Sequence, residues 1–304
     1  MGWQCLAFDN IDGVCSSAVL QRMALLKGQS VSTKFVLYPD FSSSFESLPM
    51  NPSNVTFILD LSPSELSNVL RIVNKLRGSK VYWNTHHKVS EETGDMLKSA
   101  GITFDNTQGV SATTMITERF LPHDNITQEL SRIATDREFW RRLDDRSEKI
   151  SDLIASGKDK QKLSESLSRG VFWNPKWEKE VEEYRLKKRS ALSTLLERLV
   201  LKRLSKLFVG FVLADTFLNS ADAGQFVLDQ HSTVDIVVII FRSGRISFRR
   251  RDECTVDVSL FAKKFRGGGH PYASGGLLGQ QVTLQNFQET VFSVDQTMRK
   301  VLSV

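Results

Sequence analysis

The sequence predicts an α/β protein with a parallel-sheet N-terminal domain, a charged helical connector and a smaller α/β C-terminal domain. In the first 143 residues, apolar runs of strand length alternate with segments of helical spacing, which is typical of a parallel sheet covered by helices. Charged residues at helical spacing dominate 144–206, and strand-like runs return from 207. Because 304 residues are many for one hydrophobic core, we expect domains at 1–143 and 207–304 joined by a connector at 144–206.

The composition is that of an ordinary globular protein. A net charge of +5 with 25% charged residues allows an anionic partner without requiring one. The three cysteines, Cys5, Cys15 and Cys254, lack zinc-site spacing and favour a reduced intracellular compartment. We therefore expect a cytoplasmic protein, with import into an organelle left open. No run of about 18 apolar residues is present, so no membrane association is expected.

The N-terminal elements follow from short apolar runs bounded by polar turns. A buried strand at 3–8 ends in the polar cluster Asp9–Gly13, which leads into a helix. Further strands are expected at 31–38, 55–59, 80–83 and 102–105, and helices at 14–26, 66–76, 109–116 and 125–133.

Three of these strands are followed by residues of types that commonly bind metal ions. Asp12, Asp60 and His86 each follow a strand, and the carboxyl ends of parallel strands meet at one edge of a sheet. Each aspartate alone has an ordinary alternative as a turn or helix-capping residue, but the convergence of three is stronger than any one. Asp136 is a fourth candidate, with an exposed helical acid as its alternative. Carboxylates and imidazole without thiolate suit Mn²⁺ or Mg²⁺.

The predicted connector carries a basic stretch. Lysine and arginine gather at 185–189 and again at 198–206. A solvated helix face is the ordinary explanation of such a run. The alternative is a positive surface that guides a phosphate backbone.

The C-terminal domain is expected to present cations on one strand. Strands are predicted at 208–213, 234–241 and 245–251, and helices at 219–230, 256–265 and 286–302. Strand alternation places Arg245, Ser247, Arg249 and Arg251 on one face. Because cations on one face repel one another, this pattern implies a solvent-facing edge strand or an anionic ligand.

A glycine-rich stretch at 265–276 follows, with Gly267, Gly268, Gly269 and His270 at its centre. Consecutive glycines are used where the backbone needs a positive φ or must approach a ligand closely. We expect a loop whose main-chain N–H groups and His270 cradle an anion such as phosphate, with a mobile surface loop as the alternative.

These motifs together resemble the DHH/DHHA1 phosphoesterase family, which includes oligoribonucleases, cyclic-dinucleotide phosphodiesterases and RecJ-type exonucleases. Residues 267–270 with Ala273 and Gly275 are close to the family signature GGGH-x-x-A-x-G. Residues 247–250 stand where the family has S-L-R-S, and the helix start at 111–114 also matches. The resemblance covers nearly the whole chain and implies a metal-binding first domain and a substrate-binding second domain.

The resemblance also shows where this chain departs from the family. Phe8 and Asn10 stand where the motif H-x-D-x-D-G has its histidine and first aspartate, and Thr85 replaces the acid of the D-H-H motif. The first motif's lost ligands serve one of the family's two metal sites. The ligands implied for the other site are retained, namely Asp12, Asp60, His86 and Asp136. One Mn²⁺ or Mg²⁺ per chain is therefore implied.

The function implied is a metal-dependent phosphodiesterase acting on short RNA or on cyclic or linear dinucleotides. The catalytic residues carried over are Asp60, His86 and His87, and the substrate-binding residues are Ser247, Arg249, Arg250, Gly267, Gly268, Gly269 and His270. The alternative is a catalytically inactive protein that binds nucleotide or RNA or serves as a subunit of a larger assembly. A third hypothesis is a repurposed metal site acting on a non-nucleotide phosphoester. A homodimer or larger assembly is left open.

Overall fold

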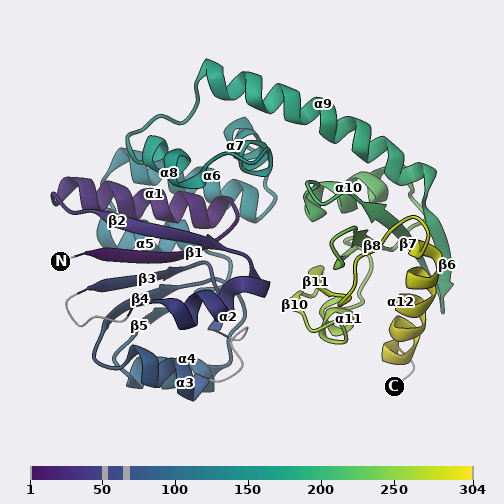
Figure 1. The fold of residues 1–304 in the computed structure, drawn as a ribbon, viewed down its shortest axis with the longest axis horizontal. Helices are drawn as coiled ribbons and strands as arrows, with labels where there is room; N and C mark the ends of the chain where they lie inside the picture. Colours follow the sequence, from purple (N-terminus) through teal and green to yellow (C-terminus); the bar gives the residue numbers. More distant parts are fainter. Residues whose placement is uncertain (1, 50–53, 64–68, 303–304) are drawn as a thin grey trace. The chain divides into compact units, whose positions relative to one another are not determined.

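A computed structural model describes residues 2–49, 54–63 and 69–302 (Figure 1). The chain divides into two compact units, Met1–Val181 and Glu182–Val304. Each unit is built on its own sheet, which confirms the predicted α/β fold class with a parallel sheet in the N-terminal part.

The first unit contains a parallel sheet of five strands. From one edge to the other, the strands are β2 (Val31–Val36), β1 (Trp3–Phe8), β3 (Val55–Leu59), β4 (Lys80–Asn84) and β5 (Thr103–Asp105). The chain passes from β1 outward to β2 and then returns to β3 on the other side of β1. Such a reversal leaves a crevice at the carboxyl ends of the two strands, where open α/β sheets bind their ligands.

Helices cover both faces of this sheet. One face, with Cys5, Ala7 and Phe57, packs against α1 (Ile11–Leu26), α5 (Ala112–Phe120), α6 (Asn125–Glu138), α7 (Asp145–Ala155) and α8 (Lys160–Ser168). The other face, with Leu6 and Trp83, packs against α2 (Tyr38–Ser47), α3 (Val69–Leu76) and α4 (Glu91–Ser99). Residues 66–68 of the helix predicted at 66–76 lie in a stretch that the structure does not describe.

The turn from β1 into α1 is tight. Asn10 caps α1 by accepting a hydrogen bond from Gly13 N at 2.7 Å. A Cβ on Gly13 would lie 1.9 Å from the carbonyl oxygen of Phe8, so only glycine lets α1 begin this close to the strand. This turn fixes Asn10 and Asp12 directly at the carboxyl end of β1.

The second unit contains a mixed sheet of six strands. In spatial order they are β10 (Gly268–His270), β11 (Ala273–Leu277), β9 (Arg245–Arg250), β8 (Ile236–Phe241), β7 (Leu207–Ala214) and β6 (Val200–Leu204). One face packs on α11 (Ser259–Lys263) and α12 (Phe287–Leu302). The other packs on α10 (Ser220–Gln230) and the carboxyl-terminal part of α9 (Pro175–Glu197).

The predicted connector, residues 144–206, is shared between the two units. Helices α7 and α8 pack into the core of the first unit together with Trp177 and Val181 from the beginning of α9. Ala191 and Leu195, later in α9, pack into the second unit, and β6 is an edge strand of its sheet. In the described part of the chain, no helix is long and apolar enough to cross a membrane.

Three expectations for the second unit differ from the structure. The glycine-rich stretch is not an open loop, because residues 268–277 form an antiparallel hairpin of two strands. Of the two alternatives for the cationic strand, the edge strand is excluded, because β9 pairs with β8 on one side and β11 on the other, and the anionic ligand stays a prediction. The helix predicted at 256–265 is shorter and covers only Ser259–Lys263.

Candidate metal centre and phosphate-binding face

Three candidate ligands from the ends of β1, β3 and β4 meet inside the first unit. One ligand atom from each of Asp12, Asp60 and His86 lies within 4.8 Å of the others, and all three side chains are buried. His86 Nδ1 is 3.1 Å from Asp60 Oδ1 and 3.7 Å from Asp12 Oδ2. The structure therefore brings together three of the four metal ligands predicted from the sequence.

Asp12 is held in place by the beginning of α5. Its carboxylate accepts hydrogen bonds from the main-chain N–H groups of Ala112 and Thr113 at 2.7 and 2.9 Å, and from Thr113 Oγ1 at 2.6 Å. Burial, and next the negative charges of Asp60 and Glu138, raise the pKa of Asp12 to about 7. The same side chain thus anchors α5 and turns one oxygen toward His86.

Asp60 is placed by an unusual backbone conformation. Its φ is 58°, in the left-handed region that aspartate tolerates better than most residues, and its N–H donates to Asn84 O at 2.8 Å. Burial works against its charged form, but the contacts with His86 and His87 outweigh burial and hold the pKa of Asp60 below its usual range. Asp60 is therefore the ionised carboxylate of the group at neutral pH.

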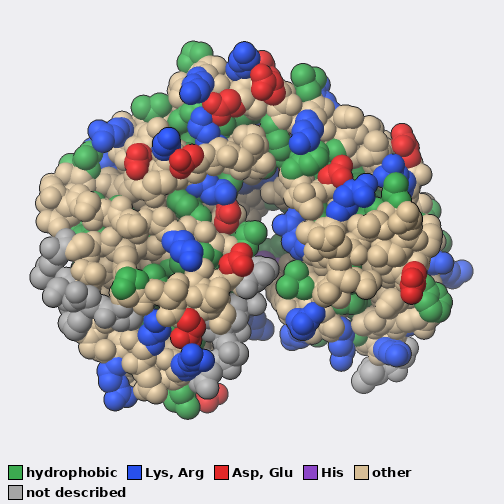
Figure 2. Space-filling model, in the orientation of Figure 1, with side chains coloured by type: hydrophobic (Ala, Val, Ile, Leu, Met, Phe, Trp, Pro, Cys, Tyr) green, Lys and Arg blue, Asp and Glu red, His purple; other side chains and the backbone are tan. Residues whose placement is uncertain are grey.

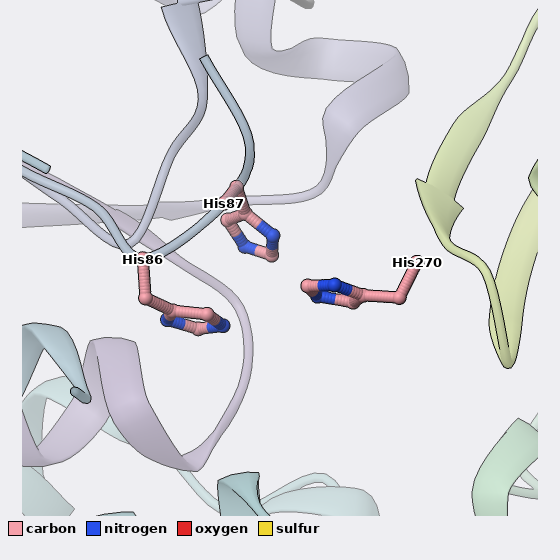
Figure 3. A group of neighbouring side chains, drawn as sticks. All are labelled: His86, His87 and His270. Atoms are coloured by element: carbon pink, nitrogen blue, oxygen red, sulfur yellow. The ribbon is translucent and has the colours of Figure 1, made fainter. Parts of the chain in front are cut away.

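His86 and His87 leave the end of β4 side by side (Figure 3). Their ring centroids are 4.4 Å apart, and Asn106 donates to the carbonyl oxygens of Thr85 and His87, which holds the turn that carries them. Burial would lower the pKa of His86, but contacts with Asp60 and Glu138 raise it to about 11. Without a metal ion, the imidazolium of His86 is the cation that balances the surrounding carboxylates.

Asp136, predicted as the fourth ligand, forms its hydrogen bonds with the segment that follows α6. Its carboxylate oxygens accept hydrogen bonds from Leu143 N at 2.7 Å and from Ser147 Oγ at 2.5 Å, which close the turn from α6 to α7. The acid that contacts the centre from α6 is Glu138, whose Oε1 lies 3.3 Å from His86 Nε2. Sequence reasoning missed Glu138, which lies two residues after Asp136 and about 200° around the helix from it, and no sequence signal distinguishes it from an ordinary helical acid.

The positions where this chain departs from the family pattern are occupied by side chains that do not bring a second set of ligands. Phe8 packs on Tyr38 with ring centroids 4.7 Å apart. The amide of Asn10 donates to Asp60 Oδ2 at 2.8 Å and to Glu138 Oε2 at 3.3 Å. Asp9 is paired with Lys160 at 2.9 Å, so it is engaged outside the group.

The remaining donors suit one divalent cation. Two carboxylates and an imidazole, with no thiolate among them, are ligands that Mn²⁺ and Mg²⁺ accept. Asp60 Oδ1 is buried and, within the described residues, accepts no hydrogen bond of acceptable geometry, although two imidazole nitrogens approach it. A buried oxygen in this state is suited to coordinate a cation.

In the second unit, three of the predicted substrate-binding residues, Ser247, Arg249 and His270, share one face of the sheet. In the antiparallel register, Arg249 is opposite Ala273 and Ala273 is opposite His270, while Ser247 is opposite Gly275. Residues directly opposite each other point to the same side. The strand alternation predicted for residues 245–251 therefore extends across β11 to His270, whose ring stacks on Tyr272 at 5.3 Å.

Helix α10 covers part of this face. A Cβ on Gly224 would lie 2.7 Å from Arg249 Cγ, and Arg249 Nη2 donates to Ser220 Oγ at 3.4 Å. Arg245 stacks on Phe241 at 3.9 Å, and burial lowers the pKa of its guanidinium. The ring contact of Arg245 offsets part of the repulsion expected among these cations. Arg249 lies beside the amino-terminal end of α10.

Arg250, predicted to bind substrate, lies on the opposite face of β9. Its guanidinium donates to the main-chain oxygens of Pro271, Arg251, Asp252 and Cys254. Arg250 therefore holds the turn after β9 against the hairpin, and these contacts favour a structural role over substrate binding.

The glycines serve the hairpin itself. A Cβ on Gly267 would lie 1.9 Å from Gly275 O, and one on Gly269, whose φ is 132°, would lie 2.7 Å from Ala273 O. Close approach of two strands therefore accounts for these glycines without a bound anion.

The basic stretch does not form a continuous solvated helix face. Lys188 is buried and pairs with Asp222 at 2.6 Å, and Lys187 lies over the ring of Phe217 at 4.2 Å. Lys202 and Arg203 lie on the edge strand β6. Acidic as well as basic side chains lie along α9 (Figure 2), so its surface is of mixed charge.

Similarity to known proteins is found in structure. No protein-family model matches the chain, and no curated protein matches it in sequence. RecJ of Thermus thermophilus in complex with Mn²⁺ is similar with a TM-score of 0.60 and 14% identity, over 98% of this chain and 52% of RecJ. PggH, a pGpG-specific phosphodiesterase from Vibrio cholerae, is similar with a TM-score of 0.55 and 13% identity, over 97% of this chain and 99% of PggH. CDC45 from Entamoeba histolytica is similar with a TM-score of 0.54 and 9% identity, over 100% of this chain and 95% of CDC45.

These similarities show a shared fold. The chain therefore has the fold of RecJ and PggH, which confirms, at the level of the fold, the resemblance inferred from residues 247–250 and 267–275. This chain spans about half of RecJ but nearly all of PggH.

Proposed function

We propose that this protein is a metal-dependent phosphodiesterase that acts on short RNA or on dinucleotides with a single Mn²⁺ or Mg²⁺. The observation that carries the proposal is the buried group of Asp12, Asp60 and His86 at the carboxyl edge of the parallel sheet. It lies at the strand-order reversal, where this class of sheet binds ligands. The names of two proteins with the same fold, RecJ with Mn²⁺ and a pGpG phosphodiesterase, agree with this chemistry.

The residues of the centre have different roles in this proposal. Asp12, Asp60 and His86 hold the cation, which when bound would neutralise charge on the phosphoryl oxygens. His87 lies 3.4 Å from Asp60 Oδ1 and is 19% exposed, whereas His86 is 2% exposed. His87 is therefore the imidazole that can reach a substrate and donate a hydrogen bond to the scissile phosphate.

The second unit supplies the binding of the phosphorylated ligand. Ser247, Arg249 and His270 share one face of the sheet, and Gly268 joins them because it is opposite Gly275 in the register. Arginine binds phosphate through a fork of N–H donors, so Arg249 is the main anion contact. Gly267 and Gly269 allow the chain of β10 to approach β11 closely, which forms the hairpin that carries His270.

A specific observation favours the alternative, a catalytically inactive protein that binds nucleotide or RNA or serves in a larger assembly. Asn10 donates hydrogen bonds to Asp60 Oδ2 and Glu138 Oε2, and the imidazolium of His86 balances the negative charge of these two carboxylates in the absence of any metal ion. A site that balances its own charges would fold and persist without catalysis.

Turnover with matched variants separates the two. The protein is incubated with Mn²⁺ and a 5′-phosphorylated dinucleotide beside Asp60→Asn and the exposed control Asp95→Asn. We expect turnover by the unaltered protein and by the control, and a loss of at least ~100-fold in Asp60→Asn, because electrostatic terms of this kind are large. Binding without turnover would establish the inactive alternative. Equal turnover by Asp60→Asn would show that a contaminating nuclease is responsible.

A further inference from the structure

Glu138 is an acid at the metal centre whose role the function proposed above does not explain. It is the last residue of α6, and its side chain is 20% exposed. Its Oε1 lies 3.3 Å from His86 Nε2, and its Oε2 accepts a hydrogen bond from Asn10 Nδ2 at 3.3 Å. Both carboxylate oxygens therefore face groups of the centre.

The two ring nitrogens of His86 face different partners. Nδ1 faces the candidate ligands Asp60 and Asp12, at 3.1 and 3.7 Å. Nε2 faces Glu138. A histidine that binds a metal through one nitrogen donates the N–H of the other to a carboxylate or carbonyl, which fixes the tautomer and strengthens the ligand. The distances place Glu138 in the position of that carboxylate.

We propose that Glu138 is a positioning residue for the metal centre: it accepts the Nε2–H of His86 and so keeps the Nδ1 lone pair directed toward Asp12 and Asp60. The inference rests on the proposed single-ion centre. It adds a residue, contributed by α6, that acts through His86 without touching the ion.

Asn10 completes this arrangement. Its Nδ2 donates to Asp60 Oδ2 as well as to Glu138 Oε2, while its Oδ1 caps α1. One amide thus links a ligand to the positioning acid and ties both to the end of β1. An aspartate at this position would instead place a third negative side chain between two others, which is unfavourable without a second cation.

An ion pair that only stabilises the fold is the competing explanation. It predicts that loss of Glu138 lowers stability and leaves the His86 tautomer and the metal affinity unchanged. A positioning role predicts a change in both, with partial rescue by glutamine, which keeps an acceptor oxygen and loses the charge.

The test measures Mn²⁺ affinity by the EPR signal of free Mn²⁺ for the unaltered protein, Glu138→Ala, Glu138→Gln and the exposed control Glu118→Gln. We expect Glu138→Ala to lose about 10- to 100-fold in affinity, Glu138→Gln to lose less, and the control to lose nothing. In parallel, ¹⁵N NMR of the Mg²⁺-loaded protein reports the tautomer of His86. We expect Nε2–H in the unaltered protein and in Glu138→Gln, whereas in Glu138→Ala only the fraction of molecules that holds Mg²⁺ shows Nε2–H.

Several outcomes would overturn the inference. Unchanged Mn²⁺ affinity in folded Glu138→Ala is one, and a His86 proton on Nδ1 in the Mg²⁺-loaded protein is another. If Glu138→Ala fails to fold, Glu138→Gln and the NMR of the unaltered protein decide the question. Failure of the proposed function looks different: Mn²⁺ affinity would still depend on Glu138, but no dinucleotide would be cleaved.

Discussion

At the scale of single residues, the buried carboxylates of the centre are balanced by the positive charge of one histidine. Asp60 is ionised, Asp12 is fixed by α5, and His86 carries the compensating proton when no metal ion is bound. A divalent cation would replace that proton. The charge state of His86 therefore links metal binding, pH and stability.

This linkage predicts a pH dependence of stability in the metal-free protein. The pKa of His86 is raised from an unfolded value of about 6.5 to about 11 in the folded chain. Its contribution is fully present below the unfolded pKa and is lost as pH rises toward the folded pKa. With EDTA present, we expect the free energy of unfolding to fall between about pH 6 and pH 9 by on the order of 1–3 kcal/mol more than in His86→Gln. Urea unfolding at the two pH values measures the free energy of unfolding. An equal change with pH in the unaltered protein and in His86→Gln would refute the prediction.

Geometry explains which residues of the centre the sequence could predict. Asp12, Asp60 and His86 each follow a strand of one parallel sheet, so their convergence follows from topology. Glu138 and Asp136 are close neighbours on one helix, and a motif match favoured Asp136. Successive helical residues turn by about 100°, so only the packing of α6 decides which of the two acids reaches His86.

At the scale of elements, the two faces of β9 have different proposed roles. Arg249 shares a face with Ser247 and His270, whereas Arg250 donates to main-chain carbonyls on the opposite face. Because side chains alternate between the faces of a strand, adjacent arginines can serve the proposed ligand binding and the fold separately.

A matched pair of variants tests this division. We expect Arg249→Gln to weaken binding of a 5′-phosphorylated dinucleotide by about 10- to 100-fold, since hydrogen bonds to charged groups contribute about 1.5–3 kcal/mol. Mn²⁺ affinity should not change. We expect Arg250→Gln to keep nucleotide binding and to lose about 1 kcal/mol of stability, because the partly buried carbonyl oxygens of Arg251 and Cys254 lose their donor.

Fluorescence titration with a labelled dinucleotide and urea unfolding measure the two effects. Weakened binding in Arg250→Gln at full folding would return that residue to the ligand site. Unchanged binding in Arg249→Gln would remove the proposed anion contact.

Elements whose hydrophobic pattern is strong were predicted well, and those defined by long-range pairing were not. The strand run at 234–241 is apolar throughout because β8 is buried on both faces, and it was predicted. The hairpin of β10 and β11 is rich in glycine, which has low strand propensity. The sequence therefore did not predict these strands or their pairing with β9. The short helices α2 and α4 give too little periodicity to be recognised.

At the scale of the whole molecule, two units divide the chemistry proposed here between metal binding and anion binding. The α/β class could be predicted because apolar runs and helical segments alternate along the first unit. The predicted connector could not be assigned from sequence, because α7, α8 and the beginning of α9 are as charged as a linker yet bury apolar stripes in the first core. Charge composition alone does not distinguish a linker from an amphipathic helix.

The number of metal ions bound is the central claim. A titration with Mn²⁺ followed by EPR measures the stoichiometry for the unaltered protein, Asp60→Asn and the control Asp95→Asn. The proposed centre, with Asp12, Asp60 and His86 as ligands, predicts one ion per chain in the unaltered protein and the control, and none bound with comparable affinity in Asp60→Asn. Two ions per chain, or one ion that persists in Asp60→Asn, would contradict it.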